Sequence, residues 1–206
     1  MKVLLVNGSP NKEGCTYMAL CECAKAIEES GGETEIIHVG KGPVYGCQAC
    51  HGCHKIGKCV FDDDICNTLS EKMAEADGII IGSPVYYASI NGTLSALLDR
   101  VFFSSGAKLR HKPAAAVVSC RRGGASAAFD RLNKYFTINE MPVVSSCYWN
   151  SVHGFTPDDV RKDKEGLAVM KTIGKNMVHM IASYEKANIA YPEPEPRVAT
   201  NFADGK

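Results

Sequence analysis

The sequence lacks several signals that would assign it to a common class of protein. Lys+Arg 23 equals Asp+Glu 23, so no excess of positive charge favours nucleic acid or an anionic membrane as a partner. No apolar run approaches the roughly 20 residues of a membrane-spanning helix. The N-terminus has no signal-peptide pattern. The Walker motif and G-x-G-x-x-G are both missing, which excludes the usual ATP and Rossmann dinucleotide loops.

Cysteine, by contrast, is abundant, with 10 residues among 206. Without a secretion signal, a disulfide scaffold is a poor explanation, and metal-binding, cluster-binding or redox roles gain weight. We therefore expect a protein of the reducing cytoplasm. The length and the 45% hydrophobic content are those of one main domain with a sizeable core.

Apolar runs alternate with amphipathic patterns along the chain, which predicts a parallel sheet with helices on both faces. The predicted strands are residues 2–6, 35–39, 78–82, 114–118 and 141–144. The predicted helices are residues 15–30, 65–75, 90–101, 125–136 and a last one that begins near Pro157. The expected fold is a doubly wound, five-stranded α/β domain over residues 1–185, followed by a Pro-rich tail over 186–206.

Three loops that follow predicted strands carry residues suited to a flat, phosphorylated ligand. Residues 8–16 offer glycines, hydroxyls and the start of a helix, which suit a phosphate, although an ordinary strand–helix turn can have the same composition. The second loop carries Tyr86 and Tyr87, and residues 119–124 of the third include two arginines and two glycines. Because parallel strands end at one edge of the sheet, a flavin mononucleotide fits these loops better than a mononucleotide substrate does.

Three motifs together resemble the NADPH-dependent FMN reductase branch of the flavodoxin superfamily. They are Gly-Ser-Pro-x-x-x-Gly-x-Thr after the first strand, Gly-Ser-Pro-Val-Tyr after the third, and Leu-x-Asp-Arg in the next helix. The resemblance implies a flavodoxin-like fold, bound FMN and NAD(P)H as co-substrate. It implies a phosphate site formed by Ser9, Asn11, Lys12, Cys15 and Thr16. It also implies that the ring is lined by Pro84, Val85, Tyr86 and Tyr87, and its far edge by Ser119, Cys120, Arg121, Gly123 and Gly124.

A second group of candidate ligands lies in the long loop of residues 40–64. Cys47, Cys50, Cys53 and Cys59 have the spacing C-x2-C-x2-C-x5-C, and four thiolates this close can hold one [4Fe–4S] cube. Zinc fits less well, because its paired C-x2-C motifs usually stand a dozen or more residues apart. With Asp62-Asp63-Asp64 behind it, the loop looks like that of the iron–sulfur flavoproteins and of their cluster-free relatives. A cluster and free thiols therefore both stay open.

These features predict an FMN-dependent NAD(P)H oxidoreductase that passes electrons to a small acceptor such as a flavin, quinone, nitro or azo compound. No catalytic side chain is assigned, because the flavin carries the chemistry. The alternatives are an iron–sulfur electron carrier that docks redox proteins and a cofactor-free regulatory or scaffold protein. We expect a homodimer or homotetramer, with residues 190–206 in contact with a second subunit. Tyr148 and Trp149 are interpreted as core or interface residues, with stacking on a substrate as the alternative.

Overall fold

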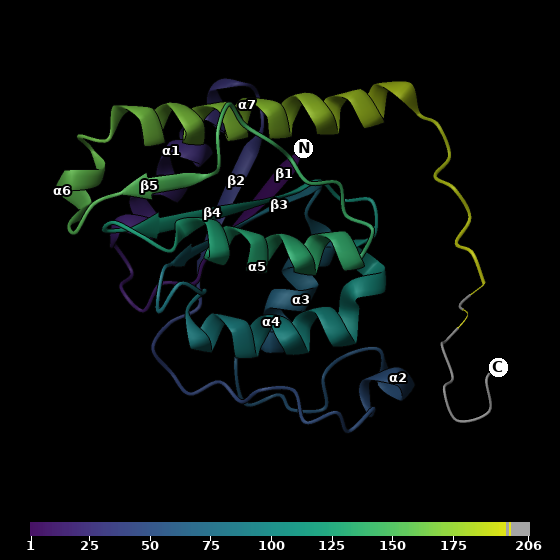
Figure 1. Ribbon diagram of the computed structural model, residues 1–206. Coiled ribbons are helices and arrows are strands. Elements are labelled where there is room, and N and C mark those ends of the chain that lie inside the picture. The colour runs from purple at the N-terminus through teal and green to yellow at the C-terminus, as the bar shows by residue number, and fades with distance from the viewer. Residues whose placement is uncertain (197, 199–206) are drawn as a thin grey trace.

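Five parallel strands form the centre of the chain, in the order β2-β1-β3-β4-β5 (Figure 1). They are β1 (Lys2–Asn7), β2 (Glu33–His38), β3 (Gly78–Pro84), β4 (Ala114–Cys120) and β5 (Ser151–His153). This computed structural model describes residues 1–196 and 198. The strand order changes direction at β1, so the predicted doubly wound fold is confirmed, with its switch point between β1 and β3.

Helices cover both faces of this sheet (Figure 1). One face carries α1 (Cys15–Glu29) and α7 (Lys164–Ala187), and the other carries α3 (Cys66–Glu75), α4 (Gly92–Ser105) and α5 (Ala125–Ile138). The short elements are α2 (Cys53–Ile56), the 3-10 helix η1 (Gly106–Leu109) and α6 (Pro157–Val160). None of the described helices combines the length and the apolar character needed to cross a membrane.

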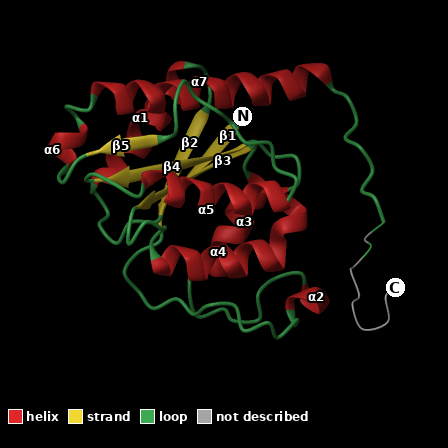
Figure 2. Cartoon of the chain, in the orientation of Figure 1, coloured by secondary structure: helices red, strands yellow, loops and turns green. Residues whose placement is uncertain are grey.

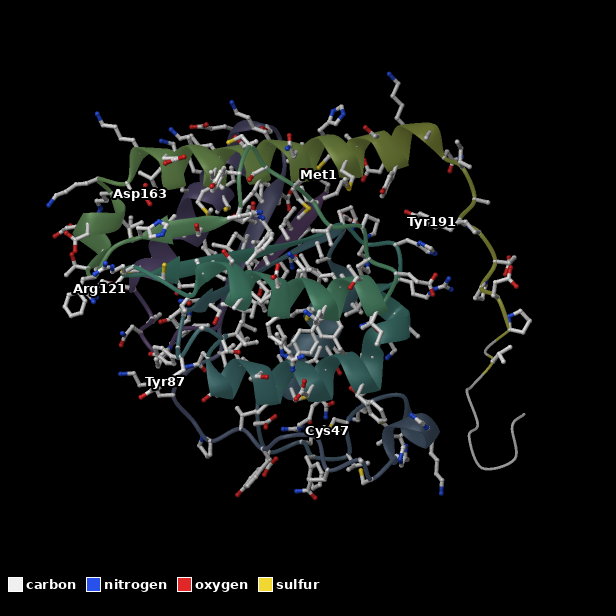
Figure 3. All side chains as sticks on the ribbon, viewed as in Figure 1. Met1, Cys47, Tyr87, Arg121, Asp163 and Tyr191 are labelled. Atoms are coloured by element: carbon white, nitrogen blue, oxygen red, sulfur yellow. The ribbon has the colours of Figure 1, made fainter. Side chains whose placement is uncertain are left out.

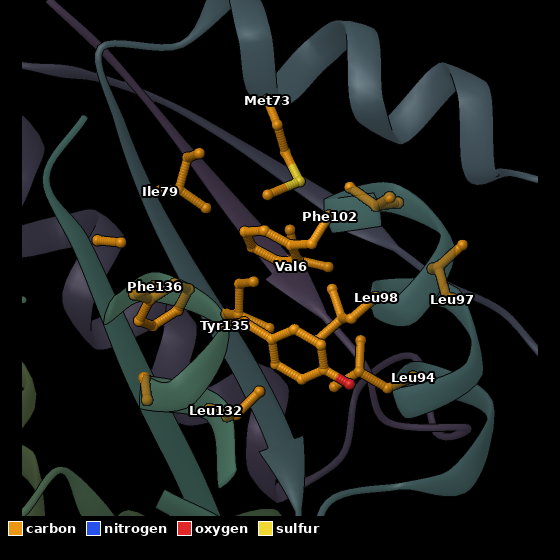
Figure 4. Close-up of a cluster of buried hydrophobic side chains, with 14 of the residues drawn as sticks. Val6, Met73, Ile79, Leu94, Leu97, Leu98, Phe102, Leu132, Tyr135 and Phe136 are labelled. Carbon is orange, nitrogen blue, oxygen red and sulfur yellow. The ribbon is translucent and has the colours of Figure 1, made fainter. Parts of the chain in front are cut away.

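Two hydrophobic cores lie on opposite sides of the sheet because successive side chains of a strand point to opposite faces. In β1, Leu4 and Val6 pack into the core under α3, α4 and α5, whereas Val3 and Leu5 pack into the core under α1 and α7. Figure 4 shows the first core, in which aromatic side chains of α4 and α5 meet aliphatic side chains of β1 and β3. Burial on both faces explains why β1 and β3 read as continuous apolar runs.

The packing of α7 against α1 depends on a glycine. A Cβ atom built on Gly174 would lie 2.7 Å from the carbonyl oxygen of Cys23 and 2.8 Å from Cβ of Ala26. Neither the backbone of Cys23 nor the Ala26 methyl group can move without disturbing α1. The absence of a side chain at Gly174 therefore allows the two helices to pack closely. The packed pair of helices covers one face of the sheet and fixes the position of α1, which follows the loop of residues 8–14.

The fifth strand was predicted at residues 141–144, and this is wrong. Residues around Val143 form only an isolated bridge with Ala114 at the start of β4, whereas the fifth strand is β5. Between them the chain leaves the sheet edge and returns at Asn150, whose carbonyl accepts from Val118 N at 3.0 Å. The edge position beside β4 is therefore shared by two short segments, and only the second forms a regular ladder.

Two other elements differ from the prediction. The single helix expected from Pro157 is split into α6 and α7, because a capping box at Thr156 begins the first and Asp163 caps the second. The loop expected at residues 40–64 contains α2, although Figure 2 shows that most of the segment between β2 and α3 is irregular.

The segment after α7 begins by packing on its own chain. The ring of Tyr191 is stacked on His111, with centroids 4.3 Å apart and an interplanar angle of 5°, and lies edge-on to Tyr184. Figure 3 places Tyr191 on the opposite side of the molecule from Tyr87 and Arg121. The predictions made for residue 197 and residues 199–206 lie outside the described residues.

Candidate functional site

The first predicted loop, which joins β1 to α1, is held by short-range hydrogen bonds. The Asn7 side chain accepts from Ser9 N at 3.1 Å and donates to the carbonyl oxygen of Lys12 at 3.0 Å. The Ser9 hydroxyl accepts from Asn11 N at 3.1 Å. Ser9 is buried, while Asn11 and Lys12 are exposed at the rim. Asn7 and Ser9 therefore fix the loop from inside, and Lys12 places a positive charge at its surface.

The end of this loop leaves the N-terminus of α1 open. The N-cap is Gly14, which offers no capping side chain, and no described acceptor faces the amides of Thr16 and Tyr17. Burial raises the pKa of the Cys15 thiol, so it stays neutral at pH 7 beside these amides. Unpaired amides at the positive end of a helix dipole are the donors that a phosphate group accepts from. These residues fit a phosphate.

The three predicted loops meet at the carboxyl edge of the sheet. Thr16 and Ser119 share a buried hydrogen bond of 2.8 Å between their hydroxyls, which ties the first loop to the third. Val85 N donates to the carbonyl oxygen of Ser119 at 2.9 Å, which ties the second loop to the third. Figure 3 shows Tyr87 and Arg121 on the same side of the molecule. The predicted juxtaposition of the loops is thus present in the structure.

The second loop projects its aromatic side chains from a strained turn. Tyr86 and Ser89 exchange two backbone hydrogen bonds of 2.9 Å, and Tyr87 and Ala88 between them have φ angles of 50° and 57°. Two central residues with positive φ define a type I′ turn, which normally uses Gly or Asn. Tyr87 is fully exposed and Tyr86 is 45% exposed, while Pro84 and Val85 are half-buried. The turn therefore holds the Tyr87 ring clear of the protein and leaves the Tyr86 ring partly covered.

The third loop needs a glycine at its close approach to the second. Gly124 has a φ of +88°, and a Cβ atom there would lie 2.9 Å from Cα of Ala88 and 3.0 Å from Cγ1 of Val85. Cys120 is buried, and burial raises the pKa of its thiol, whereas Arg121 and Gly123 are exposed. The loop therefore combines an exposed cation, a neutral thiol and a backbone that can come close to a ligand.

We expect Gly124→Ala to lower the free energy of unfolding by roughly 1–3 kcal/mol, because the new methyl group meets backbone in a conformation that favours glycine. FMN affinity should fall in the same variant, since the second and third loops must move apart. Gly123→Ala is the matched control for the unfolding measurement, because no atom lies within 4 Å of its ideal Cβ position and its φ is not positive. Denaturant unfolding and FMN titration measure both effects. An equal loss of unfolding free energy in the two variants would contradict the argument that Gly124 is needed for the close approach.

The segment of residues 40–64 that holds the four cysteines, here called the cysteine loop, runs beneath α4 (Figure 1). The side chains of Cys47, Cys50, Cys53 and Cys59 all line one small cavity, together with Phe61, Arg100 and Phe103. Cys53 is buried and starts α2, Cys59 is half-buried, and Cys47 and Cys50 are exposed. The four cysteines that the spacing singled out thus line the same cavity.

Arg100 joins this loop to α4, and sequence reasoning missed it. Its guanidinium forms an ion pair with Asp64, donates to the carbonyl oxygen of Phe61 at 2.9 Å and donates from Nε to Sγ of Cys59 at 3.3 Å. The side chains of Arg100 and Asp64 are only 1% and 7% exposed. Although burial alone would lower it, the hydrogen bonds to Cys59 and Asp64 raise the pKa of Arg100. One buried cation thus holds three points of the cysteine loop.

Asn67 fixes Cys59 from a second direction. Its side-chain oxygen accepts from Cys59 N and its amide nitrogen donates to Cys59 O, both at 3.0 Å. Cys66 is buried beside them, and burial raises the pKa of its thiol to about 12, so it stays protonated at pH 7. In the described residues, no three Cys, His, Asp or Glu side chains converge as a ready-made metal site. The four thiols that line the cavity nevertheless have the number and the chemistry of the donors that an iron–sulfur cluster takes.

The model of the NADPH-dependent FMN reductase family matches residues 1–156. The chain belongs to this family. An iron–sulfur flavoprotein of Methanocaldococcus jannaschii is 36% identical to it over 194 residues, which are 90% of this chain and 100% of that relative. As a member of the NADPH-dependent FMN reductase family, the chain is a flavin-dependent oxidoreductase.

Two solved structures of other proteins superpose on this family member and show the same fold. RosB with bound intermediate 8-demethyl-8-formylriboflavin-5′-phosphate superposes with a TM-score of 0.72 at 15% identity, over 98% of this chain and 93% of that one. A flavodoxin from the domain Archaea superposes with a TM-score of 0.59 at 16% identity, over 88% of this chain and 99% of that one. The chain therefore has the flavodoxin-like fold that the resemblance implied.

Proposed function

We propose that this member of the FMN reductase family takes hydride from NAD(P)H onto bound FMN and passes the electrons to a small-molecule acceptor, such as a flavin, quinone, nitro or azo compound. The observation that carries the proposal is the joining of the three loops by Ser119, which bonds to Thr16 and Val85. The domain of residues 1–185 would hold the cofactor. Its free cysteines suit the reducing cytoplasm, where we place the protein.

Each loop would take one part of FMN. The phosphate group is assigned to the first loop and the start of α1, namely Ser9, Asn11, Lys12, Cys15 and Thr16. The ring is assigned to Pro84, Val85, Tyr86 and Tyr87, and its far edge to Ser119, Cys120, Arg121, Gly123 and Gly124. FMN, when bound, supplies hydride acceptance and electron release, and the protein supplies position, exclusion of water and electrostatic tuning. No side chain is required as an acid or a base.

Anaerobic mixing of the purified, FMN-loaded protein with NADPH or NADH tests the activity. We expect the absorbance of the oxidised flavin to disappear after mixing with NADPH or NADH. It should return when an electron acceptor is added. Flavin that is reduced by dithionite but not by either nicotinamide would instead favour the electron carrier. Protein that binds no FMN would favour the cofactor-free alternative.

Thr16→Val should weaken FMN binding by roughly 1–3 kcal/mol, because a buried hydroxyl is lost where the phosphate is expected and Ser119 is left unpaired. Thr172→Val is the matched control, since among the described residues that hydroxyl bonds to Ala168 O and to the Cys147 thiol and to no residue of the three loops. Equilibrium dialysis with FMN gives the two affinities. A Thr16→Val protein with the parent affinity would contradict the phosphate assignment.

The second candidate function is that of an iron–sulfur electron carrier between redox proteins. It is favoured by the four thiols around one cavity and by the N–H···S bond from Arg100 to Cys59, and the Methanocaldococcus relative is named an iron–sulfur flavoprotein. A [4Fe–4S] cluster, when bound, supplies one-electron steps. Cys47, Cys50, Cys53 and Cys59 would hold it, Arg100 would keep Cys59 in place, and Asn67 would fix the backbone on both sides of that ligand.

We also propose that the protein is a homodimer or homotetramer and that residues 190–206 contribute to its assembly. Tyr191 already docks the start of this segment on His111, so the stiff Pro-rich part that follows loses little entropy when it contacts a second subunit. Deleting residues 190–206 should lower the mass measured by light scattering at micromolar concentration while leaving the unfolding midpoint nearly unchanged. A parent protein that is monomeric with full FMN and full NAD(P)H oxidation would rule out a shared site.

A further inference from the structure

A groove beside the third loop extends beyond the residues assigned to FMN. It is a cavity of about 270 Å³ between the first turns of α5 and residues 148–153. The side chains that give it its character are Arg122, Ser126, Phe129, Tyr148, Trp149 and His153. Because Gly123 and Gly124 also line it, the groove begins where the proposed far edge of the flavin ends.

The aromatic wall of the groove is a built feature. The Ser146 hydroxyl donates to Tyr148 O at 2.6 Å and lies 2.8 Å from Oδ1 of Asn150. The amide of Asn150 donates to Ala116 O at 3.0 Å inside the sheet. Tyr148 and Trp149 nevertheless remain 61% and 58% exposed. Two large aromatic side chains are thus held in water on a hydrogen-bonded segment, which is the arrangement of a stacking surface.

The polar side of the groove is cationic. Arg122 is exposed and forms no ion pair with any described residue, and no acidic side chain is among the described residues that line the cavity. His153 also lines the groove, and its Nδ1 lies 3.7 Å from Oδ2 of Asp163, which is not among the lining residues. An arginine fork next to a flat aromatic surface suits a planar ligand that carries phosphate.

We propose that this groove binds the adenosine phosphate half of the reduced nicotinamide dinucleotide. Trp149 would stack on the adenine ring and Arg122 would bind phosphate oxygens. The inference rests on the proposed function, because a donor whose nicotinamide lies over the flavin must carry its adenosine away from the ring along a neighbouring surface. The groove adjoins the third loop and has the aromatic and cationic groups that this half of the molecule needs.

Trp149 is the single tryptophan of the chain, so its emission reports on the groove directly. Adenosine diphosphate, titrated into the FMN-loaded protein, should change this emission saturably, and uncharged adenosine should bind more weakly. Calorimetry then compares variants. Arg122→Gln should weaken adenosine diphosphate roughly tenfold or more through loss of a charge-assisted contact. Trp149→Ala should weaken it by a similar factor through loss of stacking. Arg161→Gln, an exposed arginine on the α6 side outside the groove, is the control.

The readout is binding and does not depend on turnover. Flavin bleaching by NAD(P)H without any binding of adenosine diphosphate would overturn the groove assignment and leave the proposed function intact. Adenosine diphosphate binding that depends on Arg122 and Trp149, without bleaching of the flavin by NAD(P)H, would support the groove assignment and contradict the proposed function. If a quinone such as menadione changes the Trp149 emission saturably and adenosine diphosphate does not, the groove binds the electron acceptor and the adenosine assignment is wrong. Trp149 emission that responds only to protein concentration would assign this face to a second copy of the chain.

Discussion

Arg100→Met should lower the free energy of unfolding by about 3–5 kcal/mol, the usual result of removing one partner from a buried ion pair. The Asp64 carboxylate, which is 7% exposed, would lose its cation, and Phe61 O and Cys59 Sγ would each lose a donor. The cysteine loop would also lose its main link to α4. We therefore expect an earlier unfolding midpoint in denaturant and faster proteolysis within residues 45–64 than in the parent.

Two further variants separate the ion pair from the general effect of losing a charge. Arg100→Lys keeps the charge but lacks the fork that reaches several acceptors at once, so its stability should fall between those of the parent and Arg100→Met. Arg161→Met breaks an exposed pair with Asp158 and should change stability by about 1 kcal/mol or less. Arg100→Met with the stability of the parent would show that the loop is held by other contacts.

Cys50→Ala should abolish iron binding completely while FMN stays bound, if the four-thiol cavity holds a cluster. With three thiolates, one iron of the cube lacks its protein ligand. Cys50 lines the cavity under α4, and no residue of the three loops lines that cavity. Anaerobic preparation with cluster-assembly proteins, followed by iron and acid-labile sulfide assays, should give about four of each per parent chain. The same assays should give values near zero for the variant.

Cys147→Ala is the control, because Cys147 is equally exposed but lies outside the cavity and should leave the iron content unchanged. Iron-free parent protein from the same preparation would refute the cluster and leave free thiols. Stoichiometric zinc with no sulfide would refute it in favour of a structural zinc site.

The meeting of the three loops at one edge of the sheet was predictable because each loop has a local signal. Apolar strands followed by Gly, Ser and Pro mark the ends of β1 and β3, and parallel topology brings those ends together without any further information. The turn at Tyr87 and Ala88 was not predictable, because its positive φ angles occur at residues that do not usually adopt them. Its shape is imposed by the two hydrogen bonds between Tyr86 and Ser89.

The burial of Arg100 and the position of the fifth strand could not be predicted from the local sequence, for two different reasons. Arg100 follows Asp99 in an amphipathic helix, where a charge normally faces water, and it is buried only because the irregular cysteine loop folds over it. The apolar residues 141–144 looked more like a strand than Ser-Val-His at 151–153, yet hydrogen bonding to β4 favours the latter. Such outcomes depend on contacts between distant segments.

The interrupted edge of the sheet makes this scaffold suitable for loop grafting. Residues 142–144 are anchored to Ala114, and residues 150–153 are anchored separately to the second half of β4, so the pairing on either side does not depend on what connects them. The entropic cost of lengthening such a connection rises only slowly with its length. Residues 145–149 can therefore be exchanged for segments of other lengths and compositions, and libraries built at this point would vary the wall of the groove while the sheet keeps its register.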